Sequence, residues 1–254
     1  MNLPLAGLGV LVTRPAHQAS GFIHLLQQAG ATTFALPCME IQPLAPDENT
    51  RYRLQQSNSY QIVIFISANA VRHGLPLLQK QSAQQIAAIG EGSARALREQ
   101  GREVDIVADS GFRSEDLLAL PAMQSDVISG KNILIIRGRG GREVLAETLR
   151  ARGAKVDYAE VYQRSRPQTD AKWLTNLWRQ PMQLVCVTSN EMLENLYHML
   201  HEFHNQLLNT QLLVPSTRCY QLAQRLGFKH IIQAESATDN NMLNRIMTWH
   251  QTGV

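Results

Sequence analysis

Short runs of apolar residues alternate with longer amphipathic stretches along the whole chain. The apolar runs are nearly continuous, which is typical of strands buried on both faces of a parallel sheet. The amphipathic stretches between them supply the helical crossovers that parallel strands require. The predicted strands are Val10–Thr13, Thr33–Leu36, Ile62–Ile66, Ile86–Ile89, Glu103–Val107, Ile133–Ile136, Lys155–Tyr158, Leu184–Val187, Leu212–Val214 and Ile231–Gln233. The pattern therefore predicts an α/β fold.

The two halves of the chain repeat the same pattern. Arg14 lies sixteen positions before Gly30, and Arg137 lies sixteen positions before Gly153. Equal spacing predicts that one strand–helix–strand unit is used twice. The repeat continues further along the chain, from the match of Ser67 with Ser189 onward. We therefore expect two similar parallel-sheet domains, with a ligand in the gap between them.

Two extended, proline-containing stretches mark the predicted domain boundaries. Residues 37–45 and 159–167 are expected to run side by side as a two-stranded connector. One domain then comprises residues 1–36 plus 168–254, and the other comprises residues 46–158. A simple division into an N-terminal and a C-terminal half is the alternative. The discontinuous arrangement is favoured because the C-terminal segment lacks its own copy of the Arg14 unit.

Composition excludes several classes of protein. No run approaches the roughly 20 apolar residues of a membrane span, and the N-terminus lacks the basic region of a secretory signal. The three cysteines, Cys38, Cys186 and Cys219, are widely spaced, which favours a reduced, cytoplasmic setting. A net charge of +3 with dispersed basic residues argues against a nucleic-acid partner. An anionic small molecule is compatible with this charge.

Polar and basic residues follow the predicted strands. Ligands of doubly wound sheets bind at the carboxyl ends of the strands, where amides, hydroxyls and guanidinium groups suit carboxylates or phosphates. The candidate binding residues are Arg14, Ser67, Asn69, Gly90, Ser93, Arg137, Gly138, Thr188, Ser189, Ser216 and Arg218. As the alternative, Ser, Thr and Asn at these places cap helices. The two arginines can equally form ion pairs with neighbouring helices.

Cofactor and metal motifs are weak. The loop that begins Gly138-Arg-Gly-Gly-Arg resembles a dinucleotide cradle, but Glu143 stands where its third glycine belongs and would repel a pyrophosphate. His198, His201 and His204 fan around a predicted helix, so a shared metal is not expected. No cofactor and no metal are predicted.

Tyr162 is the candidate catalytic acid. It lies in the second connector stretch, where its hydroxyl could face a ligand. No Ser/His/Asp or Cys/His nucleophilic set is evident in the sequence. The alternative for a tyrosine in such a strand is packing with a polar tip.

An ordered set of motifs resembles the uroporphyrinogen-III synthase family. The motifs are Leu11-Val-Thr-Arg-Pro, Phe65-Ile-Ser-Ala-Asn-Ala-Val, Ala88-Ile-Gly-Glu-Gly-Ser-Ala, Arg137-Gly-x-Gly-Gly-Arg-x-x-Leu, Gly153-Ala-x-Val-x-x-x-x-Val-Tyr-x-Arg and Thr188-Ser-Asn. They span nearly the whole chain. The resemblance implies two flavodoxin-like α/β domains joined by a two-stranded connector, with the active site between them. One departure is that Ser216 and Cys219 stand where many relatives have glycine and threonine.

The resemblance also implies a reaction. Family members cyclise hydroxymethylbilane, a linear tetrapyrrole, with loss of water and inversion of ring D, giving uroporphyrinogen III for heme and siroheme. No cofactor takes part, and Tyr162 matches the tyrosine proposed to assist departure of the hydroxyl group. We expect a cytoplasmic monomer, supplied with substrate by hydroxymethylbilane synthase and without nucleic-acid or membrane partners. The alternative is a non-catalytic, two-domain cytoplasmic binding protein for an anionic small molecule.

Overall fold

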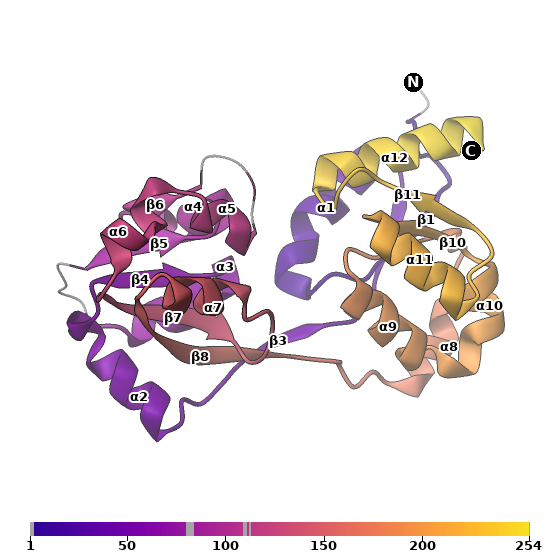
Figure 1. Ribbon diagram of the computed structural model, residues 1–254. Helices are drawn as coiled ribbons and strands as arrows, with labels where there is room; N and C mark the ends of the chain where they lie inside the picture. Colours follow the sequence, from indigo (N-terminus) through magenta and orange to yellow (C-terminus); the bar gives the residue numbers. More distant parts are fainter. Residues whose placement is uncertain (1–2, 80–83, 109–110, 112, 254) are drawn as a thin grey trace. The chain divides into compact units, whose positions relative to one another are not determined.

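The computed structural model describes residues 3–79, 84–108, 111 and 113–253, which divide into two compact units (Figure 1). Unit 1 comprises Met1–Glu40 and Ser165–Val254, and unit 2 comprises Ile41–Arg164. The chain passes between the units at two places. Both lie inside the stretches 37–45 and 159–167 that the sequence suggested as connectors.

Unit 1 is built on a five-stranded sheet with the order β11-β10-β9-β1-β2, and all of its strand pairs are parallel. Its strands are β1 (Gly9–Val12), β2 (Thr32–Ala35), β9 (Leu184–Cys186), β10 (Gln211–Val214) and β11 (Ile231–Gln233). Its helices are α1 (Ala16–Gln28), α8 (Ala171–Leu177), α9 (Asn190–Met199), α10 (His204–Asn209), α11 (Thr217–Leu226) and α12 (Asp239–Thr252).

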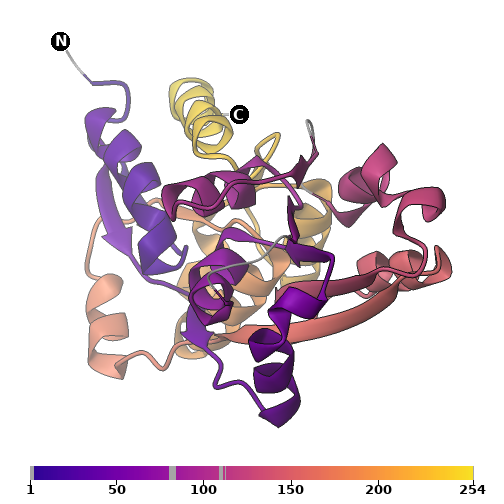
Figure 2. The same ribbon diagram turned by 90° about the vertical axis from the view of Figure 1, so that its left-hand side faces the viewer.

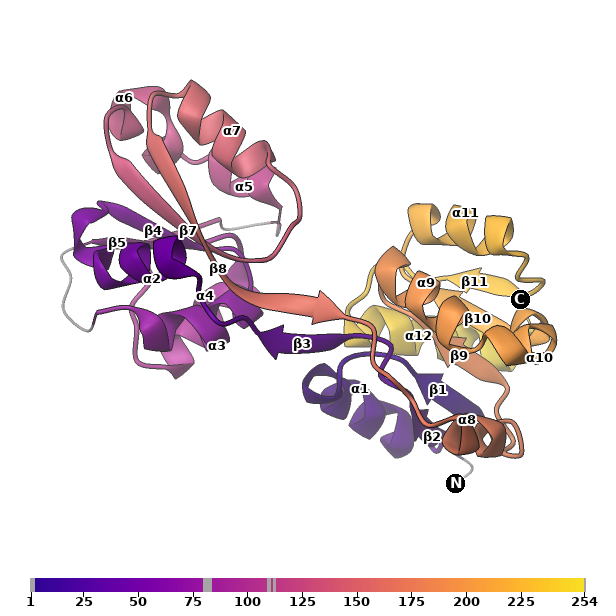
Figure 3. The same cartoon turned by 90° about the horizontal axis from the view of Figure 1, so that it is seen from below.

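Unit 2 is built on a six-stranded sheet with the order β3-β8-β7-β4-β5-β6. Its strands are β3 (Glu40–Pro43), β4 (Ile62–Phe65), β5 (Gln85–Ala88), β6 (Ile106–Val107), β7 (Asn132–Gly138) and β8 (Lys155–Ser165). Its helices are α2 (Glu48–Gln55), α3 (Ala68–Gly74), α4 (Glu91–Glu99), α5 (Ser114–Leu118), α6 (Ser125–Ile128) and α7 (Val144–Ala151). The pairs from β8 through to β6 are parallel. Figure 3 shows β3 and β8 side by side and pointing in opposite directions.

Each of the ten predicted strands overlaps a strand of the structure, and the predicted α/β class is confirmed, with two mostly parallel sheets. Most strand boundaries lie within two residues of the prediction, and two differ by more. β6 begins at Ile106 rather than Glu103, because the side chain of Asp105 accepts the N–H of Ile86 at 2.7 Å. β8 continues past Tyr158 to Ser165, because β3 pairs with it beyond the end of the parallel ladder.

Apart from β3, which adds a sixth strand to unit 2, the two sheets have the same strand order. In unit 1 the β1-α1-β2 segment comes first in the chain, and in unit 2 the equivalent β7-α7-β8 segment comes last. When each sheet is numbered from that segment, both have the flavodoxin-like order 2-1-3-4-5. The repeat seen in the sequence is thus a repeat of topology.

Apolar side chains cover both faces of each sheet, which explains the continuous apolar runs. In unit 1, helices α1 and α12 lie side by side on one face (Figure 2), while α8, α9, α10 and α11 pack on the other. In unit 2, α2, α3 and α4 cover one face and α5, α6 and α7 the other. The three cysteines are buried free thiols. No helix in the described part of the chain combines the length and the apolar character that a membrane crossing requires.

Candidate functional site

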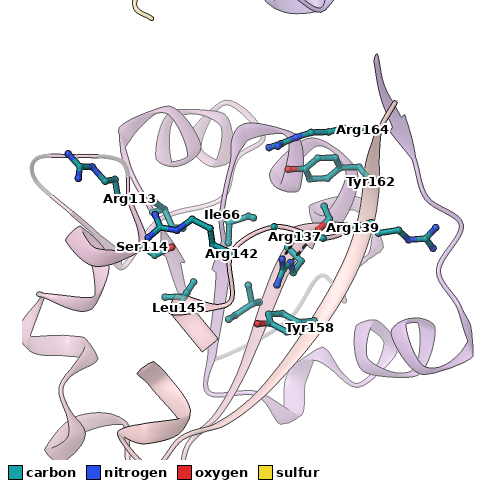
Figure 4. A pocket seen from close by; sticks show the side chains of 15 residues that line it. Ile66, Arg113, Ser114, Arg137, Arg139, Arg142, Leu145, Tyr158, Tyr162 and Arg164 are labelled. Atoms are coloured by element: carbon teal, nitrogen blue, oxygen red, sulfur yellow. Dashed lines mark hydrogen bonds between the residues drawn. The ribbon is translucent and has the colours of Figure 1, made fainter. Parts of the chain in front are cut away.

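A cavity of about 390 Å³ opens at the carboxyl ends of the strands of unit 2 (Figure 4). It lies where β4 and β7 adjoin, the point at which the strand order of this sheet reverses and where such sheets bind ligands. Its lining is Ile66, Ile89, Arg113, Ser114, Ile135, Arg137, Gly138, Arg139, Gly140, Gly141, Arg142, Leu145, Tyr158, Tyr162 and Arg164. Five of these residues are arginines and none is acidic, so the lining suits an anionic ligand.

A β-bulge in β8 sets the direction of Tyr162. Arg137 pairs with Glu160, but the next residue of β7, Gly138, pairs with Tyr162, so β8 carries one extra residue there. Without the bulge, strand alternation would place Tyr162 on the same face of the sheet as Tyr158. Tyr162 instead packs in the apolar cluster that contains Val161, whereas Tyr158 packs against the cluster on the opposite face.

Tyr162 is almost fully buried, with 1% of its surface exposed, yet it lines the cavity. Its hydroxyl oxygen lies 3.1 Å from Oγ of Ser67. A Cβ at Gly138 would lie 2.6 Å from ring carbon Cε2 of Tyr162, so only glycine lets the ring pack against the end of β7. The His73 ring lies 6.0 Å from the tyrosine ring, centroid to centroid. The tyrosine is therefore held in one position at the cavity wall.

Ser67 has two roles in this structure. Its Oγ accepts the N–H of Ala70 at 3.0 Å, which caps the N-terminus of α3. The same oxygen is the hydrogen-bond partner of Tyr162. The capping alternative raised by the sequence thus holds for Ser67, and the contact with Tyr162 comes in addition to it.

Arg137 is buried at the base of the cavity, with 4% of its surface exposed. Nη1 donates to the carboxylate of Glu143 at 2.9 Å, Nη2 donates to the carbonyl of Gly140, and Nε donates to the carbonyl of Gly138 at 3.3 Å. Its guanidinium carbon lies 4.5 Å from the ring centroid of Tyr158. The ion-pair alternative therefore describes the contacts of Arg137.

Tyr158 and Glu143 are joined by a hydrogen bond from the phenol hydroxyl to carboxylate oxygen Oε2. Burial, and then this contact with Glu143, raises the pKa of Tyr158 to about 12. The hydrogen bond from Tyr158, assisted by Arg137, lowers the pKa of the Glu143 carboxyl below its usual range. A neutral phenol thus donates to an ionised carboxylate across a wide pH range.

Four further arginines line the cavity but were not among the candidate binding residues: Arg113, Arg139, Arg142 and Arg164. Figure 4 shows Arg139 pointing away from the other three, and its Nε lies 3.8 Å from the carboxylate of Glu160. Arg142 is exposed and pairs with Glu115. Arg139 and Arg142 belong to the glycine-rich loop. Arg164 follows Tyr162 by two residues, and this closeness to the candidate acid could have marked it as a cavity residue.

The remaining candidates of unit 2 are not part of the cavity lining. Asn69 is in the first turn of α3. Gly90 is the N-cap residue of α4, and Ser93 is buried within that helix. The structure thus brings Arg137, Gly138 and Tyr162 together at the cavity, with Ser67 hydrogen-bonded to Tyr162.

In unit 1, Arg14 is engaged within its own unit. It forms an ion pair with Asp239 at the start of α12, donates to the carbonyl of Ala237 at 2.8 Å, and lies over the ring of Phe22 at 4.8 Å. Only 8% of its surface is exposed. These contacts match the ion-pair alternative for this residue.

The other candidates of unit 1 stand at helix starts. Ser189 caps α9 by accepting the N–H of Met192, and Ser216 caps α11 by accepting the N–H of Cys219. The hydroxyl of Thr188 lies 3.1 Å from the sulfur of Met192. Arg218 is exposed in the first turn of α11. They follow β9 and β10, as the strand pattern predicted.

The histidines that follow α9 make local contacts. His204 stacks on Tyr197, with ring centroids 3.9 Å apart, and its Nε2 lies 2.8 Å from the carbonyl oxygen of Tyr197. Among the residues that the structure describes, no group of three or more His, Cys, Asp or Glu side chains is arranged to hold a metal ion.

Comparison with known proteins gives one consistent result. Residues 20–244 match the family model described as uroporphyrinogen-III synthase HemD. The uroporphyrinogen-III synthase of Escherichia coli K12 is 32% identical over 248 residues, covering 94% of this chain and 100% of the relative. That of Salmonella typhimurium LT2 is 33% identical over 249 residues, with the same coverage of both chains.

Two solved structures share the fold. Uroporphyrinogen-III synthetase from Helicobacter pylori 26695 superimposes with a TM-score of 0.65 at 16% identity, covering 95% of this chain and 99% of that one. A mutant uroporphyrinogen III synthase from Thermus thermophilus gives a TM-score of 0.58 at 16% identity, with 96% and 99% coverage.

Proposed function

The chain belongs to the uroporphyrinogen-III synthase family, whose members are cyclising lyases of tetrapyrrole biosynthesis, and we propose that it performs this cyclisation at the arginine-lined cavity of unit 2. The substrate is a linear tetrapyrrole, hydroxymethylbilane. Water is lost, ring D is inverted, and the macrocycle closes to uroporphyrinogen III. The observation that carries the assignment of the site is the position of Tyr162, whose ring forms part of the wall of a cavity lined by five arginines.

Tyr162 is the proposed catalytic residue. Departure of the terminal hydroxyl of the substrate leaves a cationic carbon, and a proton or hydrogen bond given to the leaving oxygen eases that departure. A phenol can provide it without being a strong nucleophile that would trap the cation. Ser67 supports this role, because its hydroxyl can donate to Tyr162 while Tyr162 donates to the substrate.

The acetate and propionate groups of the substrate are the proposed partners of Arg113, Arg142 and Arg164, together with the main-chain amides of the loop that begins at Gly138. Guanidinium groups and amides bind carboxylates with defined geometry. The flexible chain must be folded until its two ends meet, so positioning is the main source of catalysis.

Residues of unit 1 are proposed as additional substrate contacts. Thr188, Ser189, Ser216 and Arg218 are the candidates, because each stands at the carboxyl end of a parallel strand. If they bind substrate, Thr188→Val and Arg218→Ala raise KM and leave the melting temperature nearly unchanged. Arg14 is a weaker candidate, because Asp239 and Ala237 occupy its donors.

We further propose a cytoplasmic monomer that receives hydroxymethylbilane from hydroxymethylbilane synthase. The three buried free thiols suit a reducing compartment. Sedimentation of the purified chain tests the monomer, and a transient-time measurement with the upstream enzyme tests the transfer.

The decisive experiment supplies hydroxymethylbilane, oxidises the product, and separates type I from type III isomers by chromatography. Type III product that depends on this protein supports the proposed function. If only type I product is found, which is the result of unassisted closure, the alternative of a non-catalytic binding protein for an anionic small molecule takes its place.

A further inference from the structure

Three side chains join the two ends of the cavity loop, residues 138–143. Arg137 at the end of β7 binds Glu143 at the far end of the loop, and Glu143 in turn accepts the hydroxyl of Tyr158 from β8. The ring of Tyr158 lies beneath the guanidinium group of Arg137, 4.5 Å from its central carbon. Each member of this Arg137–Glu143–Tyr158 cluster contacts both of the others.

The loop is wrapped closely around the guanidinium group. The carbonyls of Gly138 and Gly140 accept from Nε and Nη2, respectively. Gly140 and Gly141 have φ values of 74° and 102°, which favour glycine. A Cβ at Gly141 would lie 3.1 Å from Nη2 of Arg137. The three guanidinium nitrogens of Arg137 thus all have acceptors inside the loop.

The same loop is fixed to the backbone of Tyr162. The N–H of Arg139 donates to the carbonyl of Tyr162 at 2.8 Å. Gly138 pairs with Tyr162 across the β-bulge, and the absence of a Cβ at Gly138 makes room for the tyrosine ring. A displacement of the loop therefore displaces the catalytic side chain.

We infer that Arg137, Glu143 and Tyr158 are positioning residues, which hold the cavity loop and through it Tyr162, and that Arg137 is not itself a ligand of the substrate. The inference deepens the proposed function and rests on it. It also gives Glu143 a role: a carboxylate that would repel a pyrophosphate serves here as the internal counter-ion of a buried cation.

The test compares Tyr158→Phe with Tyr60→Phe in the full-length protein. Tyr60 is a matched control, because its hydroxyl donates to Asp157 at 3.0 Å and burial likewise raises its pKa to about 12, but it does not line the cavity. Both variants lose one phenol–carboxylate hydrogen bond. We expect Tyr158→Phe to lower kcat about 10-fold with little change in KM, because small misplacements of reacting groups cost up to about 100-fold. Tyr60→Phe is expected to leave kcat unchanged.

Three further variants test whether the cluster acts as a unit. Glu143→Gln is expected to lower kcat similarly, and the double variant Glu143→Gln/Tyr158→Phe to lose little more than either single one, because residues that act together are not additive. Tyr158→Leu, which also removes the ring beneath Arg137, is expected to lower kcat further than Tyr158→Phe. A kcat for Tyr158→Phe equal to that of Tyr60→Phe overturns the inference, as does a rise in KM without a fall in kcat.

Hydrogen exchange separates the inference from the proposed function. Amide exchange in peptides covering residues 139–142 is expected to speed up about 10-fold in Tyr158→Phe and to stay unchanged in Tyr60→Phe. If the wild-type protein forms no type III product, the proposed function fails, and this exchange measurement still decides whether the cluster holds the loop. Unchanged exchange in Tyr158→Phe contradicts the inference even in an active enzyme.

Discussion

The hydroxyl oxygen of Tyr162 and Oγ of Ser67 are 3.1 Å apart, and that same Oγ accepts the N–H of Ala70 at the start of α3. Ser67 is therefore fixed by the helix it caps and still has its own proton to donate. When Tyr162 gives its proton to a ligand, Ser67 can donate to the phenol oxygen in return. The hydroxyl of Ser67 thus both caps α3 and contacts Tyr162, the proposed catalytic side chain.

Tyr162→Phe removes this hydroxyl and keeps the ring. We expect the rate of type III formation to fall roughly 10²-fold to 10⁴-fold, the usual contribution of a general acid. The free energy of unfolding should change by only about 1 kcal/mol, because one hydrogen bond is lost. Steady-state kinetics with the isomer assay, beside a thermal melt, measures both quantities. An unchanged rate would remove Tyr162 from the mechanism.

Gly138→Ala places a Cβ 2.6 Å from the ring of Tyr162, so the ring or the end of β7 has to move. We expect kcat to fall about 100-fold or more, because the tyrosine leaves its position. Gly92→Ala in α4 is the matched control, since its Cβ would meet no atom within 4 Å. That change should leave kcat intact and stabilise the protein by roughly 0.5–1 kcal/mol. Equal activity of the two variants would show that Gly138 does not set the place of Tyr162.

Asp239→Asn tests whether Arg14 stabilises unit 1 rather than binding substrate. The change removes the charged partner of a nearly buried guanidinium group, so we expect a loss of about 1–3 kcal/mol in the free energy of unfolding. KM should stay within about 2-fold if Arg14 does not touch the substrate. Denaturant unfolding and steady-state kinetics measure the two effects. A large rise in KM with unchanged stability would assign Arg14 to the substrate.

The stabilising effect of Glu143 should disappear in acid. Its hydrogen bond from Tyr158 lowers its pKa in the folded protein, so its stabilising contribution is present above the usual carboxyl pKa of 4.5 and is lost as the pH falls through the lowered value. Glu143→Gln should therefore melt below the wild type at pH 7, and the gap should narrow below pH 4.5. The effect is small, because the side chain of Glu143 is about half exposed and screened by solvent. A constant gap across this range would show that the pair does not contribute through its charge.

The sheets were predictable because buried parallel strands leave continuous apolar runs, and the repeat indicated two similar domains. The β-bulge before Tyr162 was not predictable, because no glycine or proline in β8 marks Val161 as an extra residue. The ion-pair partners of the arginines could not be predicted from the sequence either. Arg14 meets Asp239 from the last helix of the chain, a pairing that only the tertiary fold defines.

The interleaved order of the units has a consequence for synthesis on the ribosome. The whole of unit 2 is one continuous segment, Ile41–Arg164, so it is complete before β9 has been made. In the complete sheet β1 lies between β2 and β9. The β1-α1-β2 segment therefore lacks one neighbouring strand until β9 has been synthesised, after the whole of unit 2. The unit that carries the arginine-lined cavity can thus fold during translation, and the unit that contains the N-terminus is completed last.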